Sequence, residues 1–507
     1  MIDVSMMTAS ARILCLALLL SSSACARPLP SGRADAGRPD PFLAGAARRA
    51  VTPDLGSAHP VFVAGFSRGT RAEAIHDDLW ARALVLTDGA GRSVGLVTLD
   101  LIGFFHDDVE ALRSELADRH PDVALDYLAV SSTHNHAGPD VIGLWTPMGG
   151  SVDADYVARI RREAADAVAE AWRNRRPAEI YLGESPAPDL AHDSRLPEVI
   201  DETLLVMGVA EAGSGRGIAA LVNWNSHPGV VGDDNTTISA DFPGGTARRV
   251  EGEWGGVCLY ASGALGGQIG SSRIKVREPE TGLKPGSRLR RAELLGDAVG
   301  AIAMAALDRA REKGPEASPI IRIRKRTLHL PMDNARFALG LSMGLIRPRR
   351  LYPPGGEGPG RLPSDLPREE SLLPGAFSVR TEVALVDVGS LRWAMIPGEL
   401  YPELSLGAIE DPQDPGADFQ GAPREPALRA LSDKPLFLIG LANDEVGYII
   451  PKSQWDTAAP YAYGLDEPQY GEANSLGPET APLLMDALRE LFSEDPSASV
   501  LKQAAPE

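Results

Sequence analysis

From about residue 60 onward, apolar and polar positions alternate between the short period of buried strands and the longer period of amphipathic helices. Short apolar runs bounded by turn residues predict buried strands; these runs lie at 96–100, 127–130, 218–222, 383–386, 393–396 and 436–439. Helical spacing of apolar residues predicts helices at 107–118, 153–174, 288–312 and 481–492. This alternation predicts an α/β fold with a mixed β-sheet core flanked by helices.

Segments rich in proline and glycine suggest the domain boundaries. Residues 27–55 are rich in Pro, Gly, Ala and Arg and are expected to form a flexible lead-in. The folded domain is expected to span residues 56–495, followed by a polar tail at 496–507. Residues 346–374 are also rich in Pro, Gly and Arg, but the strand pattern resumes after them. We therefore expect a long loop within the domain that borders a substrate cleft.

The N-terminus has the features of a signal peptide over residues 1–26. Arg12 precedes the apolar run 13–20, which is followed by small residues and is short for a transmembrane helix. Ala24-Cys25-Ala26 fits a cleavage site, whereas Ser22 to Cys25 resembles a bacterial lipobox. Both alternatives predict export, either as a secreted protein or as a periplasmic or outer-membrane lipoprotein acylated on Cys25.

Composition limits the classes of function. The chain has 507 residues, 44% hydrophobic and 23% charged, which is typical of a soluble globular protein. Its net charge of -19 argues against a nucleic acid as partner. Of the three cysteines, Cys15 and Cys25 lie in the signal segment, so Cys258 is expected to be an unpaired core residue.

Two histidines follow the apolar run 127–130, in the segment 133–139 with sequence Thr-His-Asn-His-Ala-Gly-Pro. Residues two apart on a strand point to the same face. If the strand continues, His134 and His136 direct two imidazoles into one cavity, which suits a metal ligand beside a proton-transfer group. The alternative is a pair of surface histidines at the end of a strand.

Other predicted strands also end in a side chain that can bind metal or transfer protons. His227 follows the strand 218–222, Glu399 follows 393–396 after Pro397-Gly398, and Tyr448 closes a segment that follows 436–439. Functional sites of α/β folds gather at the ends of strands. We therefore expect these side chains to meet at one edge of the core, although a structural role for His227 alone is an alternative.

Taken together and in this order, these segments resemble the catalytic domain of the neutral (alkaline, non-lysosomal) ceramidases. The motifs that carry the resemblance are Thr-His-x-His to Pro at 133–139, Trp to His at 224–227, Pro-Gly-Glu at 397–399, and Gly-Leu-Ala-Asn to Tyr at 440–448. The stretches 76–83 and 470–478 are also similar to the family, and the resemblance extends from about Val61 to Leu491. It implies the ceramidase fold without the C-terminal immunoglobulin-like domain that ceramidases carry.

The resemblance also implies a catalytic centre with one zinc ion. The implied zinc ligands are His134, His227, Glu399 and Tyr448. His136 would then act as general base and acid. Arg195 and Tyr470 would stabilise the oxygen of the tetrahedral intermediate. The alternative for Arg195 is a surface arginine paired with a carboxylate such as Asp201.

The implied reaction is hydrolysis of the amide bond of an N-acyl lipid of ceramide type, giving a free fatty acid and a sphingoid amine. The partners would be this lipid and, through an acyl anchor on Cys25, a membrane surface. Two alternatives remain open: a zinc amidase acting on another N-acyl compound, and a non-catalytic surface lipoprotein that retains the fold.

One motif favours a different chemistry. Residues 65–69, Gly-Phe-Ser-Arg-Gly, match the Gly-x-Ser-x-Gly pattern of serine hydrolases. That pattern requires a helix directly after the serine, whereas residues 68–71 are typical of a turn. We therefore do not expect Ser67 to be a nucleophile.

Overall fold

The computed structural model describes residues 40–316, 318–366 and 373–494, which all belong to one compact unit. The predicted signal peptide at 1–26, with Cys25, lies outside the described residues, as does the polar tail at 496–507.

The larger of two main sheets has eight strands in the order β10-β8-β7-β6-β1-β3-β4-β5. The pairs β4–β5 and β8–β10 are parallel and the other pairs are antiparallel, so the sheet is mixed, as the sequence predicted. The strands are β1 (Leu43–Ala50), β3 (Trp80–Thr87), β4 (Ser93–Leu99), β5 (Tyr127–Ser132), β6 (Arg176–Pro186), β7 (Thr203–Glu211), β8 (Gly217–Trp224) and β10 (Val257–Ser262).

A second sheet packs on one face of the first. Its strands are β11 (Ile321–Pro331), β12 (Leu351–Tyr352), β13 (Ser378–Val388), β14 (Leu391–Met395) and β16 (Leu436–Ile439). Leu84 and Leu86 of β3 face this second sheet and share a core with Trp393 and Phe437. The alternate residues of β3 face the helices instead. Strands buried on both faces have nearly continuous apolar sequences, which is why these runs are easy to recognise.

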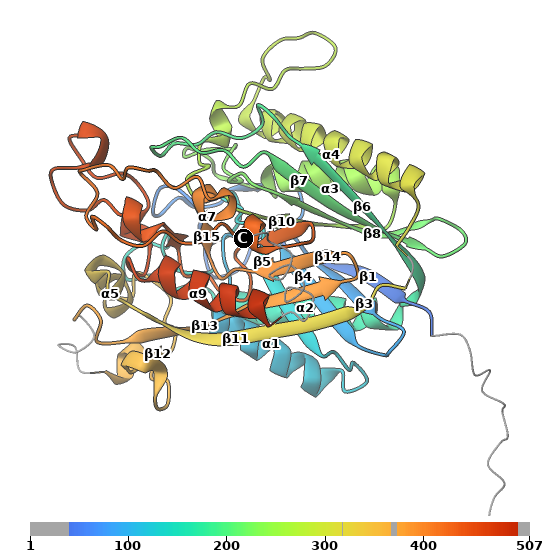
Figure 1. Cartoon of the computed structure of the whole chain (residues 1–507), viewed down its shortest axis with the longest axis horizontal. Helices are drawn as coiled ribbons and strands as arrows, with labels where there is room; N and C mark the ends of the chain where they lie inside the picture. The colour runs from blue at the N-terminus through green and yellow to red at the C-terminus, as the bar shows by residue number, and fades with distance from the viewer. Residues whose placement is uncertain (1–39, 317, 367–372, 495–507) are drawn as a thin grey trace, which may run out of the picture. The chain divides into compact units, whose positions relative to one another are not determined.

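Helices cover the outer faces of both sheets (Figure 1). They are α1 (His106–Arg119), α2 (Ala154–Arg173), α3 (Asp241–Trp254), α4 (Arg288–Lys313), α5 (Ala335–Ser342), α7 (Pro402–Leu406), α8 (Leu428–Leu431) and α9 (Thr480–Ser493). Helix α2 packs on β1 and β3, α4 packs on β6 and β7, and α9 packs on β11 and β13. Asp153 and Ser287 accept backbone N–H bonds at the starts of α2 and α4, which stabilises these helix ends.

Several very short elements complete the fold. The two-residue strand β15 (Glu399–Leu400) runs parallel to β17 (Tyr448–Ile449), and β2 (Ala74–Ile75) runs parallel to β9 (Thr237–Ile238). The 3₁₀ turns are η1 (Ser271–Arg273), η2 (Pro354–Gly356), η3 (Pro363–Asp365), η4 (Lys452–Gln454), η5 (Ala462–Gly464) and η6 (Glu472–Asn474).

The expectation of an irregular lead-in over 27–55 is wrong for Leu43–Ala50, which forms β1 between β6 and β3. This strand is rich in Ala and Gly because helix α2 crosses it closely. A Cβ atom on Gly45 would lie 2.1 Å from the carbonyl oxygen of Ala171 in α2. Gly45, one of the small residues that resembled a linker, is therefore required by this packing.

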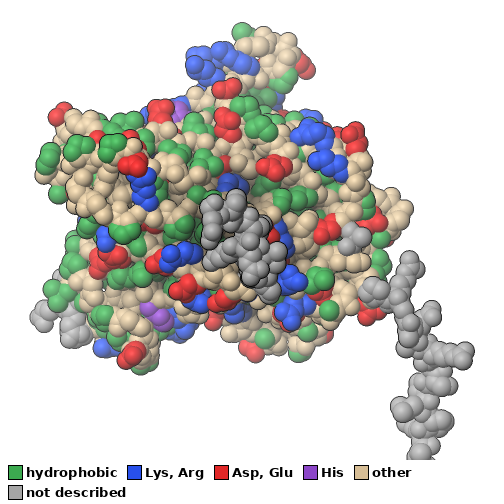
Figure 2. All heavy atoms as spheres, viewed as in Figure 1, with side chains coloured by type: hydrophobic (Ala, Val, Ile, Leu, Met, Phe, Trp, Pro, Cys, Tyr) green, Lys and Arg blue, Asp and Glu red, His purple; other side chains and the backbone are tan. Residues whose placement is uncertain are grey.

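Cys258 is a buried free cysteine in β10, as the count of cysteines predicted. On the face shown in Figure 2, acidic and basic side chains are interspersed. In the part of the chain that the structure describes, no helix is long and apolar enough to cross a membrane.

Candidate active site

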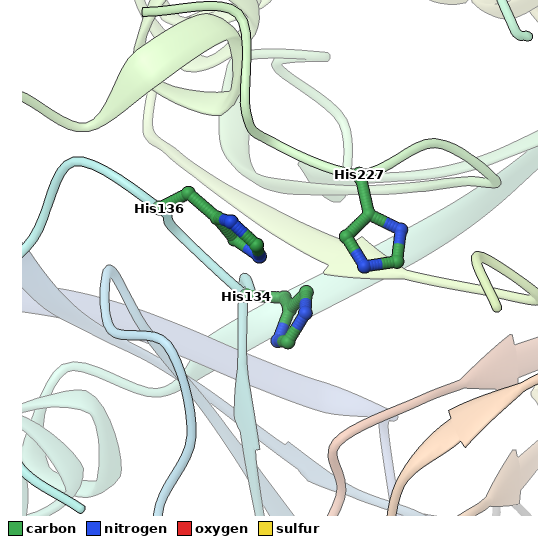
Figure 3. A group of neighbouring side chains, drawn as sticks. All are labelled: His134, His136 and His227. Atoms are coloured by element: carbon green, nitrogen blue, oxygen red, sulfur yellow. The ribbon is translucent and has the colours of Figure 1, made fainter. Parts of the chain in front are cut away.

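Three imidazole rings converge beyond the ends of strands β5 and β8 (Figure 3). His134 and His136 lie in the loop after β5, and His227 lies in the loop after β8. The ring centre of His134 is 4.7 Å from that of His227 and 4.8 Å from that of His136. One ring nitrogen from each histidine lies within 4.8 Å of the others, a spacing suited to a shared metal ion. The structure thus brings together the histidines that the sequence singled out.

The strand register proposed for His134 and His136 is wrong. Strand β5 ends at Ser132, and His134 has a positive φ of 64°, an uncommon conformation for a residue other than glycine. The side chain of Asn135 fixes the loop, since it donates to Ser239 O at 2.7 Å and accepts the N–H of Ala137 at 2.9 Å. The two rings are directed by this buried loop and not by the pleat of a strand.

Backbone carbonyls define the tautomers of two of the histidines. Nδ1 of His134 lies 2.7 Å from Ile102 O, and Nδ1 of His227 lies 2.9 Å from Leu265 O. A carbonyl oxygen can only accept, so each Nδ1 carries the proton. The Nε2 atoms face Oε2 of Glu399, at 3.1 Å from His134 and 2.9 Å from His227.

These contacts bring several electron-pair donors to one point. Burial lowers the pKa of His227, which favours a neutral ring with a lone pair on Nε2. Burial alone would raise the pKa of Glu399, but the neighbouring His134 and His227 hold it well below its usual range. A carboxylate oxygen and two imidazole nitrogens thus meet at hydrogen-bond distance, where either a proton on a ring or a bound cation would satisfy the carboxylate. Nitrogen and oxygen donors of these kinds fit zinc, and the bonds from Nδ1 to carbonyls are typical of metal-binding histidines.

Tyr448 completes the group. Its hydroxyl oxygen lies 3.3 Å from Nε2 of His227, and its backbone pairs with Glu399 through β15 and β17. Burial, with Glu399 nearby, raises the pKa of Tyr448 well above its usual value, so a nearby cation would be needed for the phenol to ionise. The four predicted ligands therefore lie around one point.

His136 differs from the other two histidines. Neither of its ring nitrogens has a hydrogen-bond partner among the described residues. Its ring packs against Gly65 and against the ring of Phe66. The ring centres of His136 and Phe66 are 5.3 Å apart. Burial first, and then His134 and His227, lower its pKa well below the usual value. A neutral imidazole with a free nitrogen can act as a base or as a further metal ligand.

His134, His136, Glu399 and Tyr448 lie in the wall of a cavity of about 300 Å³. Much of the wall is apolar and is formed by Ile102, Phe105, Ile142, Leu144, Trp145, Phe337, Leu345 and Ile346. The other polar side chains in the wall are Arg68, Arg336, Glu445, Tyr470 and Asn474. Ile346 is the only described residue of the segment 346–374 that lines the cavity, so this loop borders it through its first residue.

Tyr470 lies in the cavity wall, as its predicted role requires. Its side chain is 61% exposed, and its hydroxyl accepts a bond from Nδ2 of Asn474 at 3.0 Å. Its ring centre lies 5.6 Å from that of Tyr448. The hydroxyl is thus close to the proposed metal centre and still reachable from outside.

The structure does not bring Arg195 into the wall of this cavity. Its guanidinium group binds both carboxylate oxygens of Glu472, at 2.6 and 2.9 Å. It also donates to the backbone carbonyls of Tyr470 and Gln454. The predicted direct role at the substrate oxygen is therefore not supported, because the terminal nitrogens are already used. The alternative partner Asp201 pairs with Arg429 instead.

The sequence analysis missed several cavity residues, among them the acidic side chain of Glu445. It lies three residues before Tyr448 and is 6% exposed. An acidic residue inside an otherwise buried segment at a strand end was the available signal. The residues of α5 carried no such signal, because their apolar pattern is that of any short amphipathic helix.

Comparison with known proteins identifies the fold. No protein-family model and no curated protein matches the sequence. Among solved structures, neutral ceramidase from Pseudomonas aeruginosa superposes with a TM-score of 0.65 at 16% identity, covering 92% of this chain and 75% of that chain. A ceramidase complexed with C2 gives a TM-score of 0.64 at 17% identity, covering 92% and 76%. The chain therefore has the neutral ceramidase fold.

Proposed function

We propose that the protein is a zinc-dependent hydrolase that cleaves the amide bond of an N-acyl lipid of ceramide type. The products would be a free fatty acid and a sphingoid amine. The observation that carries this proposal is the convergence of Nε2 of His134, Nε2 of His227 and Oε2 of Glu399 within hydrogen-bond distance, with each Nδ1 held by a backbone carbonyl. His134 and Glu399 lie in the wall of a largely apolar cavity, and the chain has the fold of known ceramidases.

The proposed zinc ligands are His134, His227, Glu399 and Tyr448. When bound, zinc supplies a Lewis acid and lowers the pKa of a water ligand to about 7. The bonds from His134 and His227 to Ile102 O and Leu265 O hold both rings in the tautomer that leaves Nε2 free. These bonds prepare the site before any substrate arrives.

His136 is the proposed general base and acid. Its ring nitrogens are unpartnered among the described residues, and its low pKa favours the neutral form at pH 7. One nitrogen can therefore accept a proton from the attacking water and later deliver it to the nitrogen of the leaving amine. A three-histidine metal site that includes His136 is the competing arrangement, because its nitrogen lies within 4.8 Å of the others.

Tyr470 is the proposed donor to the oxygen of the tetrahedral intermediate, since its hydroxyl lies in the cavity wall near Tyr448. Arg195 acts through Tyr470. It binds the backbone carbonyl of Tyr470 at 3.1 Å and is a positioning residue in this proposal.

The apolar wall favours a lipid substrate. Burying each methylene group of an acyl chain contributes about 0.8 kcal/mol. Side chains such as Phe105, Trp145 and Phe337 provide this environment next to the histidines. A small polar amide would gain little from such a wall, whereas an acyl chain would bind and exclude water from the reacting bond.

The test is incubation of the purified protein with a panel of N-acyl lipids, with release of fatty acid followed by mass spectrometry and zinc measured on the same sample. We expect about one zinc per chain and hydrolysis of ceramide-type amides that a chelator stops. Hydrolysis of other N-acyl compounds alone would favour the broader amidase. A protein with neither zinc nor hydrolysis would be a non-catalytic lipoprotein with this fold.

We further propose export and anchoring by an acyl group on Cys25, because an N-acyl lipid lies in or near a membrane. Several acyl chains on one cysteine would give stable attachment, at about 0.8 kcal/mol for each buried methylene. Cys25→Ser should move the protein from membrane to soluble fractions and leave hydrolysis of detergent-dispersed substrate intact. Wild-type protein found soluble and cleaved after Ala26 would contradict the anchor.

A further inference from the structure

Glu445 places a carboxyl group in the wall of the cavity that the proposed metal ligands Glu399 and Tyr448 also line. It lies in the segment between β16 and β17 and is 6% exposed. Oε1 accepts the backbone N–H of Gly447 at 2.8 Å. Oε2 is buried and has no hydrogen-bond partner within the described residues.

The surroundings of Glu445 do not supply the missing partner. The guanidinium of Arg349 binds Asp444 at 2.6 Å and the backbone carbonyl of Glu445, not its side chain. On the other side the Glu445 side chain lies against Gly103, where a Cβ atom would fall 2.8 Å from Cγ of Glu445. A buried polar oxygen without a partner destabilises a fold, so its presence in a cavity wall calls for an explanation such as contact with a ligand.

We propose that Glu445 is a specificity-determining residue whose free carboxyl oxygen binds a hydroxyl group on the amine part of the substrate. This inference rests on the proposed amide hydrolysis. The acyl part of a lipid amide is apolar and fits the apolar wall, so a polar group near the reacting bond belongs to the amine part.

A hydroxyl group fits this oxygen in either protonation state. It donates to a carboxylate and accepts from a carboxylic acid. The torsion about the last bond of a Glu side chain is soft, so the carboxyl group can turn toward a group in the cavity. An amine part without a hydroxyl would leave this oxygen unpaired and would be discriminated against.

The chain offers a matched control in Glu425. This residue is 8% exposed, its Oε1 accepts the backbone N–H of Lys452 at 3.0 Å, and its Oε2 is also buried without a partner among the described residues. Glu425 does not line the catalytic cavity. The two glutamates therefore share their local chemistry and differ in access to the substrate.

The experiment compares two amides with the same acyl chain, one of a long-chain amino alcohol and one of an alkylamine of equal length without hydroxyl groups. The measured quantity is the ratio of their kcat/KM values, with zinc content determined for each protein. We expect the wild type and Glu425→Met to prefer the hydroxylated amide by about ten- to hundred-fold. Glu445→Met should retain zinc and bring the ratio to within about three-fold of one.

A second variant and a binding measurement separate the recognition role of Glu445 from an effect of its substitution on folding. Glu445→Gln preserves an acceptor for Gly447 and should give a ratio between those of the wild type and Glu445→Met. The dissociation constants of both amides are also measured for the inactive His136→Ala protein, which should bind the hydroxylated amide more tightly. Adding Glu445→Met to this protein should abolish that preference. An unchanged ratio in a folded Glu445 variant, or an equal loss in Glu425→Met, overturns the role of Glu445.

Failure of the proposed function would look different. If the wild type hydrolyses neither amide, the reaction is wrong, and the binding preference of the His136→Ala protein still decides whether Glu445 recognises the hydroxyl group.

Discussion

Two clusters of buried polar side chains in this molecule differ in how their charges are paired. In the proposed metal centre, Nε2 of His134 and Nε2 of His227 lie 3.1 and 2.9 Å from the same oxygen of Glu399. In the second cluster, the guanidinium of Arg195 meets the carboxylate of Glu472 in a two-pronged ion pair, and both side chains are 3% exposed.

The difference shows which cluster is complete. The Arg195–Glu472 pair satisfies itself, because each donor faces an acceptor. It also ties the backbone of Tyr470 to that of Gln454, which makes it a structural clamp. In the proposed metal centre, one carboxylate faces two imidazoles that carry no permanent charge, so a bound cation would complete this cluster. An incomplete buried cluster is evidence for a ligand, whereas a buried ion pair is not.

The largest expected effect comes from removing one donor of the incomplete cluster. His134→Ala should abolish zinc binding and lower kcat/KM by about 10³-fold or more, because the remaining donors no longer enclose the ion. Zinc analysis of the purified variant and the fatty-acid assay check this result. Retention of stoichiometric zinc by His134→Ala would contradict the ligand assignment.

His136→Ala should keep zinc and lower kcat by about 10²- to 10⁴-fold, the range of a lost general base. The reason is that its nitrogens do not share the Glu399 contact and have no other partner among the described residues. The control is the zinc content of the same sample. Loss of zinc here, together with its retention in His134→Ala, would exchange the two roles and favour the three-histidine site.

Breaking the complete cluster should affect stability first. Arg195→Met leaves Glu472 buried without its cation and should lower the free energy of unfolding by about 3–5 kcal/mol, measured by urea denaturation. Zinc content should stay unchanged. The double variant Arg195→Met with Glu472→Met should recover most of this loss. If the double variant is as unstable as the single one, the pair is not a self-satisfied clamp.

Glu403 is a buried acid that differs from both clusters, because its carboxyl group is hydrogen-bonded neither to an arginine, as in Glu472, nor to imidazoles, as in Glu399. Both oxygens lack hydrogen bonds within the described residues, and burial raises the pKa of this carboxyl group to about 8. In the unfolded chain the pKa is about 4.3. Between these values only the folded state keeps the proton, so stability is greatest below the lower pKa and falls as pH rises toward 8.

The slope from this one group is at most about 1.4 kcal/mol per pH unit within that window. Glu403→Gln should remove this contribution to the pH dependence of stability, because glutamine does not titrate. Urea denaturation of both proteins at pH 5 and pH 8 measures the difference, and the variant should gain stability relative to the wild type only at the higher pH. An identical pH dependence in the two proteins would contradict the raised pKa.

The sequence was sufficient for the elements with a clear apolar pattern and for several strand ends that carry candidate site residues, but not for β3, β6, β7, β11 or α3. Strands such as β8 and β16 are buried on both faces and are therefore apolar along their length, which a single sequence reveals. Strand β1 was missed because its Gly45 is explained only by the close approach of α2. A contact between distant segments leaves no periodic pattern in either of them.

The same limit applies to the candidate site. His134, His227 and Glu399 follow recognisable strands, so their meeting could be expected. The clamp between Arg195 and Glu472 joins residues 277 positions apart, and no local pattern indicates whether an arginine faces a substrate or a carboxylate. The loop conformation that directs His134, with its positive φ, was likewise invisible because it depends on buried bonds made by Asn135.

The smallest expected effect concerns Ser67, which belongs to neither cluster. Ser67 is exposed, and the chain after it turns back so that Val63 N–H bonds to Thr70 O at 2.9 Å. The helix that a nucleophile elbow requires is thus replaced by a tight turn. Ser67→Ala should leave kcat/KM within about two-fold of the wild type, while phenanthroline should stop hydrolysis in both proteins. Labelling of Ser67 by a fluorophosphonate with loss of activity would mean that the serine, and not the incomplete cluster, performs the reaction.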